Sequence, residues 1–556
     1  MARAAVRDVA RALGHSYAIG DKVAKTIPFG AQGFPVTIAG ALESEPELKE
    51  LQKKDPVVRQ ILEYAQKIEG NARHVGVHAA GVVMAPTPTT DFTPIQLDPK
   101  GGKIITQYDM YSVEDAGLLK FDFLGLKNLS VLADSIKRVK RIKNIDVDVY
   151  NLPMDNAETF KMLSEGRTMG VFQFASSGMT QYLKELQPTS VFDLNAMVAL
   201  YRPGPMEFIP EYIARKRDPS RVKYLDPRME AILNRSYGII TYQDDVLMIA
   251  IQLAGYSWLD ADKFRKAMGK KIPEEMAAQK EVFMKGCAER GMKPETIQKL
   301  WEQIETFAAY GFNKAHAASY GNLAYKTAYM KANYPLEYMS ALLTADAGDV
   351  EKIAEIVKEC EAMNITVLPP DVNESYPVFS VVTTQERTIR FGLNSIKNFG
   401  EGISEAIVEE RKLHGAYKDL ADFLTRVPDK NLNKRALEAL VKSGALDSFG
   451  TRGKLIANLD AILSFRKEIT TESDQDSLFG SSQSSSLSLE EAPDASITDK
   501  LVWEKELLGL YVSGHPLDAF SAQLKGKADI YTTKHEMHVG ITTVVAGLIE
   551  DVRTVL

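Results

Sequence analysis

The sequence predicts a multidomain α+β protein that is mainly helical. Its 556 residues exceed what one hydrophobic core usually organises, so we expect about three to five domains. Helical periodicity dominates residues 1–72 and 128–364, whereas residues 78–127 and 365–393 carry short strand signals. The chain length and this alternation of helical and strand-bearing stretches together give the fold class.

Composition narrows the class of protein without giving a function. The chain is 45% hydrophobic and 25% charged, as in ordinary globular proteins, and no apolar run approaches the ~20 residues that span a bilayer. Its two cysteines, Cys287 and Cys360, support neither a disulfide framework nor a zinc site, so a reducing cytoplasm is the simplest compartment. The net charge of −7 argues against a wholly basic nucleic-acid coat but leaves room for local basic patches.

The strand-bearing stretch 78–127 contains one aspartate of special interest. We expect strands at 81–84, 103–106 and 119–124. In the last of these, Lys120, Asp122 and Leu124 point to one side. An aspartate flanked by two phenylalanines is costly to bury unless it is paired or bound to metal, although an edge strand could also expose it to water. Two-metal phosphoryl transfer needs several carboxylates around Mg²⁺ ions roughly 4 Å apart, so Asp122 would need partners.

Two other aspartate pairs invite a catalytic interpretation that their surroundings disfavour. Asp146 and Asp148 follow a basic helix and precede a proline, which fits a surface loop. Asp244 and Asp245 resemble the Tyr-x-Asp-Asp turn of reverse transcriptases, where the aspartates lie at a hairpin tip. Here an apolar run at 246–253 follows without β alternation. We therefore expect Asp244 and Asp245 in the first turn of a helix, where the macrodipole stabilises acids.

A basic run at 263–271 is the first candidate anion site. It places five cations in nine residues with no acid among them: Lys263, Arg265, Lys266, Lys270 and Lys271. Most such runs are solvated helix faces. The Met268-Gly269 step between the two basic clusters suits close approach of the backbone to a ligand. A polyanion such as a nucleoside triphosphate is a reasonable ligand.

The segment 310–335 is the second candidate. It mixes cations with aromatic residues: Lys314, His316, Lys326 and Lys331 with Tyr310, Phe312, Tyr320, Tyr325 and Tyr329. Cations bind phosphates and aromatic faces stack on nucleobases. Tyr325 and Tyr329 are four residues apart and share one helix face. The alternative is an amphipathic core helix with solvated lysines.

A Gly-x-Gly step at Gly400 and Gly402 predicts a DNA contact. An apolar residue, Gly-x-Gly and then a helix form a helix-hairpin-helix signature, whose backbone N–H groups meet a DNA phosphate. We assign DNA binding to Lys397, Asn398, Gly400 and Gly402. The alternative is an ordinary turn before a helix, because a lone Gly-x-Gly step is a weak signal. A second helical pattern at 433–447 supports a tandem unit.

The polar stretch 470–500 is rich in Ser, Asp and Glu and predicts a flexible linker. It contains Gln475, Leu478 and Phe479. Exposed apolar side chains in such sequence have nothing local to bury against, so a short motif that docks into a partner explains them, with chance as the alternative.

Together these segments resemble the catalytic alpha subunits of bacterial DNA polymerase III, the C-family replicases. The resemblance covers nearly the whole chain. The segments that carry it are 72–86, 117–129, 170–179, 199–205, 237–246, 263–271, 310–320, 366–375, 475–480 and 507–517, with the Gly-x-Gly hairpin.

The resemblance implies a domain order. From the N-terminus, the implied domains are a helical thumb (1–77), a polymerase-beta-like palm remnant (78–127), helical fingers (128–390), a tandem helix-hairpin-helix unit (391–469), a linker with a sliding-clamp motif (470–500), a connector (501–540) and the start of a truncated OB-fold (541–556). It also implies two Mg²⁺ ions in the complete active site. The implied partners are primer-template DNA, deoxynucleoside triphosphates, the sliding clamp and other replicase subunits, with no membrane.

The resemblance also assigns roles to residues. Asp122 matches the third catalytic carboxylate and metal ligand of the palm. The nucleotide side of the fingers would include Arg202, Arg265, Lys266, Lys270, Lys271, Lys314 and His316. Gln475, Leu478 and Phe479 match the clamp-binding motif.

The sequence departs from the family in one respect. It contains neither the Pro-Asp-x-Asp-x-Asp strand with the paired aspartates nor the N-terminal phosphoesterase-like domain. We therefore expect a fragment of a polymerase that performs template-directed DNA synthesis by two-metal nucleotidyl transfer, inactive alone. One alternative is a non-catalytic DNA- and clamp-binding module. A weaker alternative is a reverse-transcriptase-like enzyme that uses Asp244 and Asp245.

Overall fold

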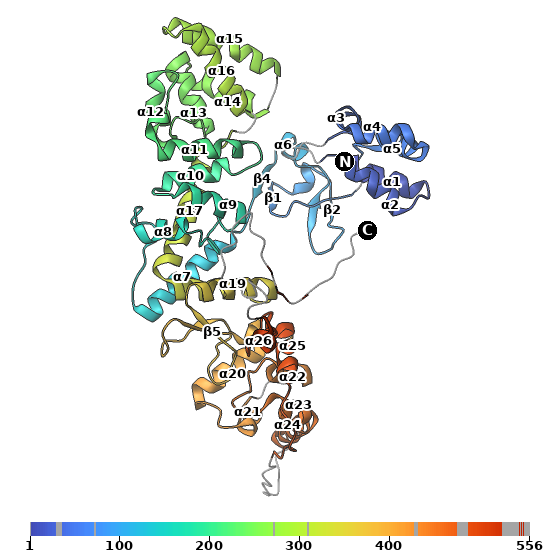
Figure 1. Cartoon of the computed structure of the whole chain (residues 1–556). Helices are drawn as coiled ribbons and strands as arrows, with labels where there is room; N and C mark the ends of the chain where they lie inside the picture. The colour runs from blue at the N-terminus through green and yellow to red at the C-terminus, as the bar shows by residue number, and fades with distance from the viewer. Residues whose placement is uncertain are drawn as a thin grey trace. The chain divides into compact units, whose positions relative to one another are not determined.

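The computed structural model divides the chain into two compact units (Figure 1). It describes residues 2–28, 36–71, 74–270, 273–308, 311–427, 432–474 and 487–524, together with residues 544, 546, 547 and 549. The first unit comprises residues 1–126 and 202–206, and the second comprises residues 127–201 and 207–556. Among the described residues, no helix is long and apolar enough to cross a membrane.

The first unit begins with helices, as predicted. They are α1 (Ala2–Ala12), α2 (Tyr17–Thr26), α3 (Ile38–Ser44), α4 (Pro46–Lys54) and α5 (Pro56–Ile68). Asp55 shows why α5 begins where it does, because its side chain accepts the N–H groups of Val57 and Val58 and a proline follows at the first helical position. The apolar faces of these helices, including Val6, Ile61 and Leu62, share one core in which these three side chains are 0% exposed.

Two small antiparallel sheets follow in the same unit. Strand β1 (Gly81–Met84) pairs with β4 (Leu119–Asp122), and β2 (Ile95–Leu97) pairs with β3 (Ile104–Thr106). A short helix, α6 (Ser112–Asp115), precedes β4. The three strands expected from the sequence are confirmed. Alternation along β4 separates Leu119 and Phe121, which are 63% and 43% exposed, from Lys120 and Asp122 on the opposite face.

Helices dominate the first part of the second unit. They are α7 (Lys127–Lys143), α8 (Ala157–Ser164), α9 (Ser177–Leu186), α10 (Val191–Leu200), α11 (Ile209–Arg217), α12 (Glu230–Leu233), α13 (Gln243–Ile249), α14 (Trp258–Lys270), α15 (Pro273–Glu289), α16 (Pro294–Ala308), α17 (Lys314–Asn333), α18 (Pro335–Ala345) and α19 (Val350–Ala362). The long helix α17 packs against α10, α8, α18 and α7. Small buried residues on α17, such as Ala317, Gly321 and Ala324, allow this close packing.

The contact between α17 and α10 gives a stability prediction. A Cβ added at Gly321 would lie 2.0 Å from Oδ1 and 3.1 Å from Cα of Asn195, so Gly321→Ala should overpack the interface. We expect it to destabilise the second unit by about 1–3 kcal/mol, more than any gain in helix propensity. Thermal unfolding should show a lower midpoint for Gly321→Ala than for Ser319→Ala on the exposed side of α17. Equal midpoints for the two variants would contradict the tight contact.

A three-stranded sheet and further helices complete the second unit. Strand β7 (Thr388–Arg390) lies between β5 (Thr366–Leu368), which is parallel to it, and β6 (Ser380–Val381), which is antiparallel. The helices are α20 (Glu401–His414), α21 (Leu420–Arg426), α22 (Lys434–Lys442), α23 (Arg452–Ala457), α24 (Leu459–Asp474), α25 (Ile497–Leu508) and α26 (Ser521–Leu524). One continuous core runs from Val139 on α7 through Phe391 to Leu437 and Leu508. The domain boundary predicted near residue 390 therefore does not divide the core.

Helices lie at both ends of the predicted flexible linker 470–500. Helix α24 continues through Asp474, and α25 begins at Ile497. Between them, Asn458 exchanges two hydrogen bonds of 2.8 and 2.9 Å with the backbone of Glu490, and Leu487 and Leu489 pack on the core. Composition hides these long-range partners. The predicted clamp-binding residues Gln475, Leu478 and Phe479 lie outside the described residues, as does most of the predicted OB-fold start at 541–556.

Candidate functional site

Asp122 lies at the end of β4, where its carboxylate is held by a neighbouring lysine. Lys120 Nζ donates to both oxygens of Asp122 at 3.0 Å, and His78 Nδ1 lies 3.6 Å from Oδ1. The Asp122 side chain is 49% exposed, so the strand exposes the aspartate and does not bury it between Phe121 and Phe123. The predicted common direction of Lys120 and Asp122 is confirmed. The sequence analysis assigned no role to Lys120 or His78. The spacing of two residues between Lys120 and Asp122 nevertheless indicated that both side chains lie on one face of the strand.

The described residues around Asp122 do not fit a pair of magnesium ions. Mg²⁺ is bound by several oxygen ligands, and a two-metal site needs carboxylates that bridge the ions. In the part of the chain that the structure describes, no group of three or more His, Cys, Asp and Glu side chains could hold a metal ion. Asp122 supplies one carboxylate, and the ammonium of Lys120 already neutralises it.

Asp244 and Asp245 lie in the first turn of α13, as the sequence predicted. Asp245 is 1% exposed, and its Oδ2 accepts the N–H groups of Thr241 and Tyr242 at 3.0 and 2.9 Å. Burial raises the pKa of Asp245, and the two backbone hydrogen bonds and the charge of Lys314 oppose this rise. These contacts differ from an exposed hairpin tip and remove the structural basis for a reverse-transcriptase-like site.

The N-terminal turns of α17 carry the predicted mixture of cation and aromatic rings. Lys314 is half exposed and its Nζ lies 5.4 Å from the centre of the Tyr242 ring. The ring of His316 lies 5.4 Å from that of Phe312 and 4.2 Å from that of Tyr320. The His316 N–H donates to Asn313, which caps the helix. This end of α17 thus carries the half-exposed Lys314, the exposed ring of His316 and the half-buried rings of Phe312 and Tyr320.

The second half of α17 is core, in agreement with the alternative interpretation. The Tyr325 and Tyr329 rings do share a face, with centres 6.4 Å apart, but Tyr325 is 0% exposed. The buried ammonium of Lys331 donates to the carbonyl oxygens of Arg167 and Met169 and to Glu359. Sequence spacing alone did not separate the two halves of the helix.

The cations of α14 are partly neutralised by acids of the same helix. Lys263 lies 3.6 Å from Asp260, and Arg265 and Lys266 lie 2.8 and 2.9 Å from Asp262. The hydrogen bonds from Lys266 and Arg265 lower the pKa of Asp262. These i, i+3 and i, i+4 pairs are exposed and therefore weak, so a more highly charged anion could displace the carboxylate.

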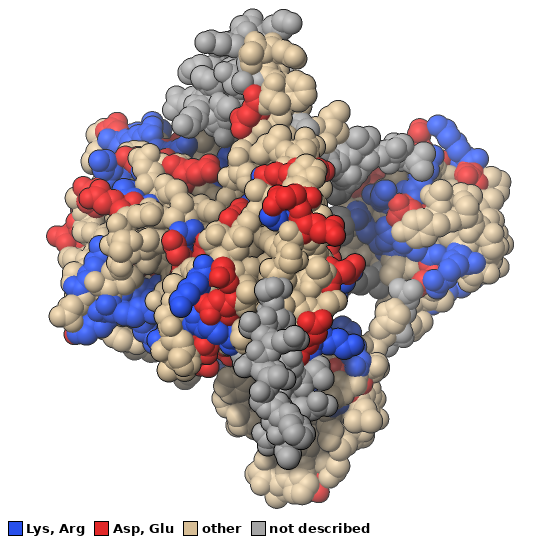
Figure 2. All heavy atoms as spheres, turned by 90° about the horizontal axis from the view of Figure 1, so that it is seen from below, with Lys and Arg blue, Asp and Glu red and all other residues tan. Residues whose placement is uncertain are grey.

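The remaining predicted nucleotide-binding residues are Arg202, Lys270 and Lys271. Lys270 ends α14, but its side chain is not described, and Lys271 lies outside the described residues. Arg202 is half-buried, and burial lowers its pKa. Figure 2 shows a face of the molecule on which Lys and Arg side chains lie among Asp and Glu side chains, in keeping with local patches on an acidic protein.

The Gly-x-Gly hairpin precedes α20 and is anchored in the core. Ile396 and Phe399 are 1% and 8% exposed, while Lys397, Asn398 and Gly400 are exposed. Asn398 has φ +70°, in the left-handed region that asparagine tolerates. Gly400 is the N-cap of α20 and has no side chain to cap the first N–H groups, which suits contact with a phosphate.

A residue that sequence reasoning missed lies beside this hairpin. Arg435 Nη2 donates to Oδ1 of Asn398 at 2.5 Å, although the two residues are 37 positions apart. Arg435 belongs to the first turn of α22. The only sequence signal was the Asn433-Lys434-Arg435 step at the start of the second helical pattern. The structure therefore places a cation beside the predicted DNA-binding residues.

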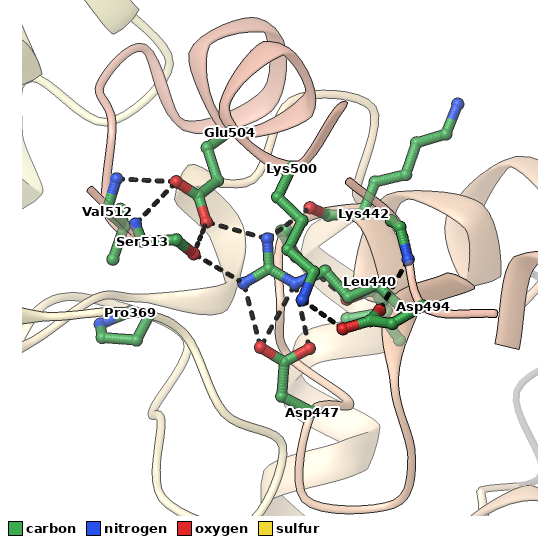
Figure 3. Close-up of polar contacts among 12 residues, drawn as sticks. Pro369, Leu440, Lys442, Asp447, Asp494, Lys500, Glu504, Val512 and Ser513 are labelled. Atoms are coloured by element: carbon green, nitrogen blue, oxygen red, sulfur yellow. Dashed lines mark hydrogen bonds and ion pairs between the residues drawn. The ribbon is translucent and has the colours of Figure 1, made fainter. Parts of the chain in front are cut away.

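A buried ion pair supports the base of the hairpin. Arg452 Nη1 donates to Glu504 at 2.8 Å, and the two side chains are 4% and 0% exposed. Figure 3 shows Glu504 turned toward Val512 and Ser513, whose N–H groups donate to it at 2.7 and 2.8 Å. On the same helix, the carbonyl oxygen of Leu507 accepts the N–H of Lys397 at 3.0 Å. Helix α25 thus contacts the hairpin through a backbone hydrogen bond to Lys397.

Three family models match the chain. Residues 1–125 match the bacterial DNA polymerase III alpha NTPase domain, residues 128–291 match the bacterial DNA polymerase III alpha subunit finger domain, and residues 364–455 match a helix-hairpin-helix motif. The first two matches cover the Asp122 strand and α14, and the third covers the Gly-x-Gly hairpin.

Curated relatives agree with these matches. The DNA polymerase III subunit alpha of Thermus aquaticus is 46% identical over 93% of this chain and 42% of its own length. The subunit of Borreliella burgdorferi is 41% identical over 93% of the chain and 45% of its own length. That of Escherichia coli K12 is 38% identical over 100% of the chain and 49% of its own length. The chain thus spans a little under half the length of these relatives, and it belongs to the family of bacterial DNA polymerase III alpha subunits.

Proposed function

We propose that this chain supplies the DNA-binding and nucleotide-binding surfaces of a replicative DNA polymerase. The complete subunit would transfer deoxynucleotides to the primer 3′-hydroxyl under the direction of a template. Its relatives are named as alpha subunits of DNA polymerase III. Membership of this family supports the same DNA-synthesis reaction for a complete subunit that contains this chain. Within the described residues, the hairpin before α20, the cations of α14 and the N-terminal turns of α17 support this proposal.

The observation that carries the proposal is the pairing of Arg435 with the Asn398 hairpin. A phosphate at the N-terminus of α20 would meet uncapped backbone N–H groups, the ammonium of Lys397 and the guanidinium of Arg435. None of these groups reads a base edge, so they would bind DNA without regard to sequence.

DNA binding of the full chain tests this proposal. We expect Arg435→Ala and Lys397→Ala to weaken binding of a labelled primer-template in fluorescence anisotropy. Each should lower the slope of log affinity against log salt by about 1, because one phosphate contact is lost. Lys358→Ala on the exposed side of α19 is the control and should leave affinity and slope unchanged. If Arg435→Ala matches this control, the hairpin is not the DNA contact.

We propose a nucleotide role for Arg265 and Lys266 on α14 and for Lys314 and His316 in the first turn of α17. Their charges would neutralise the triphosphate, and the rings around His316 offer stacking surfaces. Asp122 is proposed as one carboxylate of the complete metal site, which would need further carboxylates from outside the described residues.

A second candidate function is a DNA- and clamp-binding module without catalysis. It is favoured by the described part of the chain, where Asp122 belongs to no group of three or more His, Cys, Asp and Glu side chains that could hold a metal ion. Binding to a sliding clamp through Gln475, Leu478 and Phe479, binding to other replicase subunits and a cytoplasmic location stay predictions.

A further inference from the structure

Asp244 and Asp245 both contact Lys314, which lies 70 and 69 positions later in the sequence. Asp244 Oδ2 accepts the backbone N–H of Lys314 at 3.0 Å, and Asp245 Oδ1 lies 3.4 Å from Nζ of the same lysine. The backbone joins the same two elements, because the N–H of Gln243 donates to the carbonyl of Phe312 at 2.8 Å. The start of α13 therefore fixes both the main chain and the side chain of Lys314.

The carboxylate of Asp245 is buried and hydrogen-bonded, unlike the carboxylate of a surface ion pair. Its side chain is 2% exposed, and its other oxygen accepts two backbone N–H groups. A neutral acceptor would satisfy these N–H groups equally well, since caps of asparagine and serine do so in other helices. The negative charge, which is costly to bury, therefore needs a further partner, and the ammonium of Lys314 is that partner.

Lys314 keeps a free approach from solvent. Its side chain is 50% exposed while the carboxylate beneath it is buried. The Tyr242 ring lies under the same ammonium, with Nζ 5.4 Å from its centre. An ammonium carries three donors, so an anionic ligand can share it with Asp245 without breaking the pair.

We propose that Asp245 is a positioning residue for nucleotide binding, which holds the ammonium of Lys314 where it meets the phosphates of a deoxynucleoside triphosphate. The proposal rests on the nucleotide role proposed above for Lys314. Asp245 touches no ligand itself and acts through the lysine. Asp244 has the supporting task of fixing the first turn of α17, on which Lys314 and His316 lie.

A double-mutant cycle on the full chain tests the proposal. The probe is a fluorescently labelled deoxynucleoside triphosphate, displaced by unlabelled tripolyphosphate. We expect Lys314→Ala to weaken binding about tenfold, as for loss of one charge-assisted hydrogen bond, and Asp245→Asn to weaken it roughly three- to tenfold. In the Lys314→Ala background, Asp245→Asn should have no further effect. Asp226→Asn, whose carboxylate pairs with Arg228, is the matched control and should bind as the parent does.

Thermal unfolding separates positioning from a structural role. Asparagine keeps an oxygen for the two backbone N–H groups, and burial disfavours the charged form of aspartate, so Asp245→Asn should unfold at or above the parent's temperature. If the asparagine variant does not fold, Asp245→Ser replaces it in the cycle and keeps a hydrogen-bond acceptor. Weakened binding with unchanged unfolding supports the proposal.

Three outcomes overturn it, and they are distinguishable. If Lys314→Ala weakens binding but Asp245→Asn does not, or if the two losses add in the double variant, Asp245 does not act through the lysine. If Lys314→Ala itself binds as the parent does, the nucleotide role of Lys314 is wrong and the inference falls with it.

Discussion

Asp122→Asn is expected to reduce primer extension roughly 1,000-fold in a complete alpha subunit that carries this segment, a loss of about 4 kcal/mol of transition-state stabilisation. The reason is chemical: an amide keeps the shape of the side chain but not the charge that a divalent cation requires. The carboxylate lies at the end of β4, half exposed and held by Lys120, so the substitution should leave the strand intact.

The measurement needs a full-length protein. Replacing the matched segment of the Thermus aquaticus subunit with this chain would provide the rest of the polymerase, since the two are 46% identical over that segment. Asp91→Asn, an exposed carboxylate of the same unit, is the control and should retain full activity. Asp244→Asn should lose far less activity than Asp122→Asn. If Asp122→Asn extends primers as the control does, Asp122 is not a metal ligand.

Glu504→Ala is expected to destabilise the second unit by about 3–5 kcal/mol. The substitution leaves the buried guanidinium of Arg452 with Asp447 as its remaining charged partner and orphans the N–H groups of Val512 and Ser513. Because α25 also accepts the N–H of Lys397, DNA binding by the hairpin should weaken as well. Hydrogen exchange of α22 and α25 reports the local loss without assuming two-state unfolding of the whole chain.

Matched variants and pH sharpen this test. Glu506→Ala, on the exposed side of α25, should change little, and equal effects of the two variants would contradict the account. Arg452→Met combined with Glu504→Leu should be more stable than either single change, because no buried charge is left unpaired.

Burial opposes ionisation of Glu504, but hydrogen bonds from Ser513, Val512 and Arg452 lower its pKa. Its stabilising contribution is therefore complete above the unfolded pKa near 4.5 and is lost as the pH falls toward the folded pKa.

Local signals in the sequence predicted much of the fold. Alternation gave the strands around 81–84 and 119–122, and an apolar run without alternation placed Asp244 and Asp245 on a helix. Glycine spacing located the hairpin before α20, and the mixture of charge and rings located the first turns of α17. These features depend on neighbours within a few residues, which periodicity and capping rules describe.

Long-range partners could not be predicted in this way. Arg435 reaches Asn398 across 37 residues, and Arg452 reaches Glu504 across 52. The two hydrogen bonds between the Asn458 side chain and the backbone of Glu490 have the same origin, because the polar composition of residues 470–500 alone predicts a linker. The pairing of Asp262 with Arg265 and Lys266 is different, because the i, i+3 and i, i+4 spacing on one helix did signal it.

Primer extension by this chain alone is the most direct test of the central proposal. We propose that the chain binds DNA and triphosphate, and that its described residues contribute Asp122 as one carboxylate of a metal site that needs others. The chain is mixed with labelled primer-template, all four deoxynucleoside triphosphates and Mg²⁺, and binding and product are read from the same reaction. We expect a bound primer of unchanged length. A primer that grows along its template would contradict the claim.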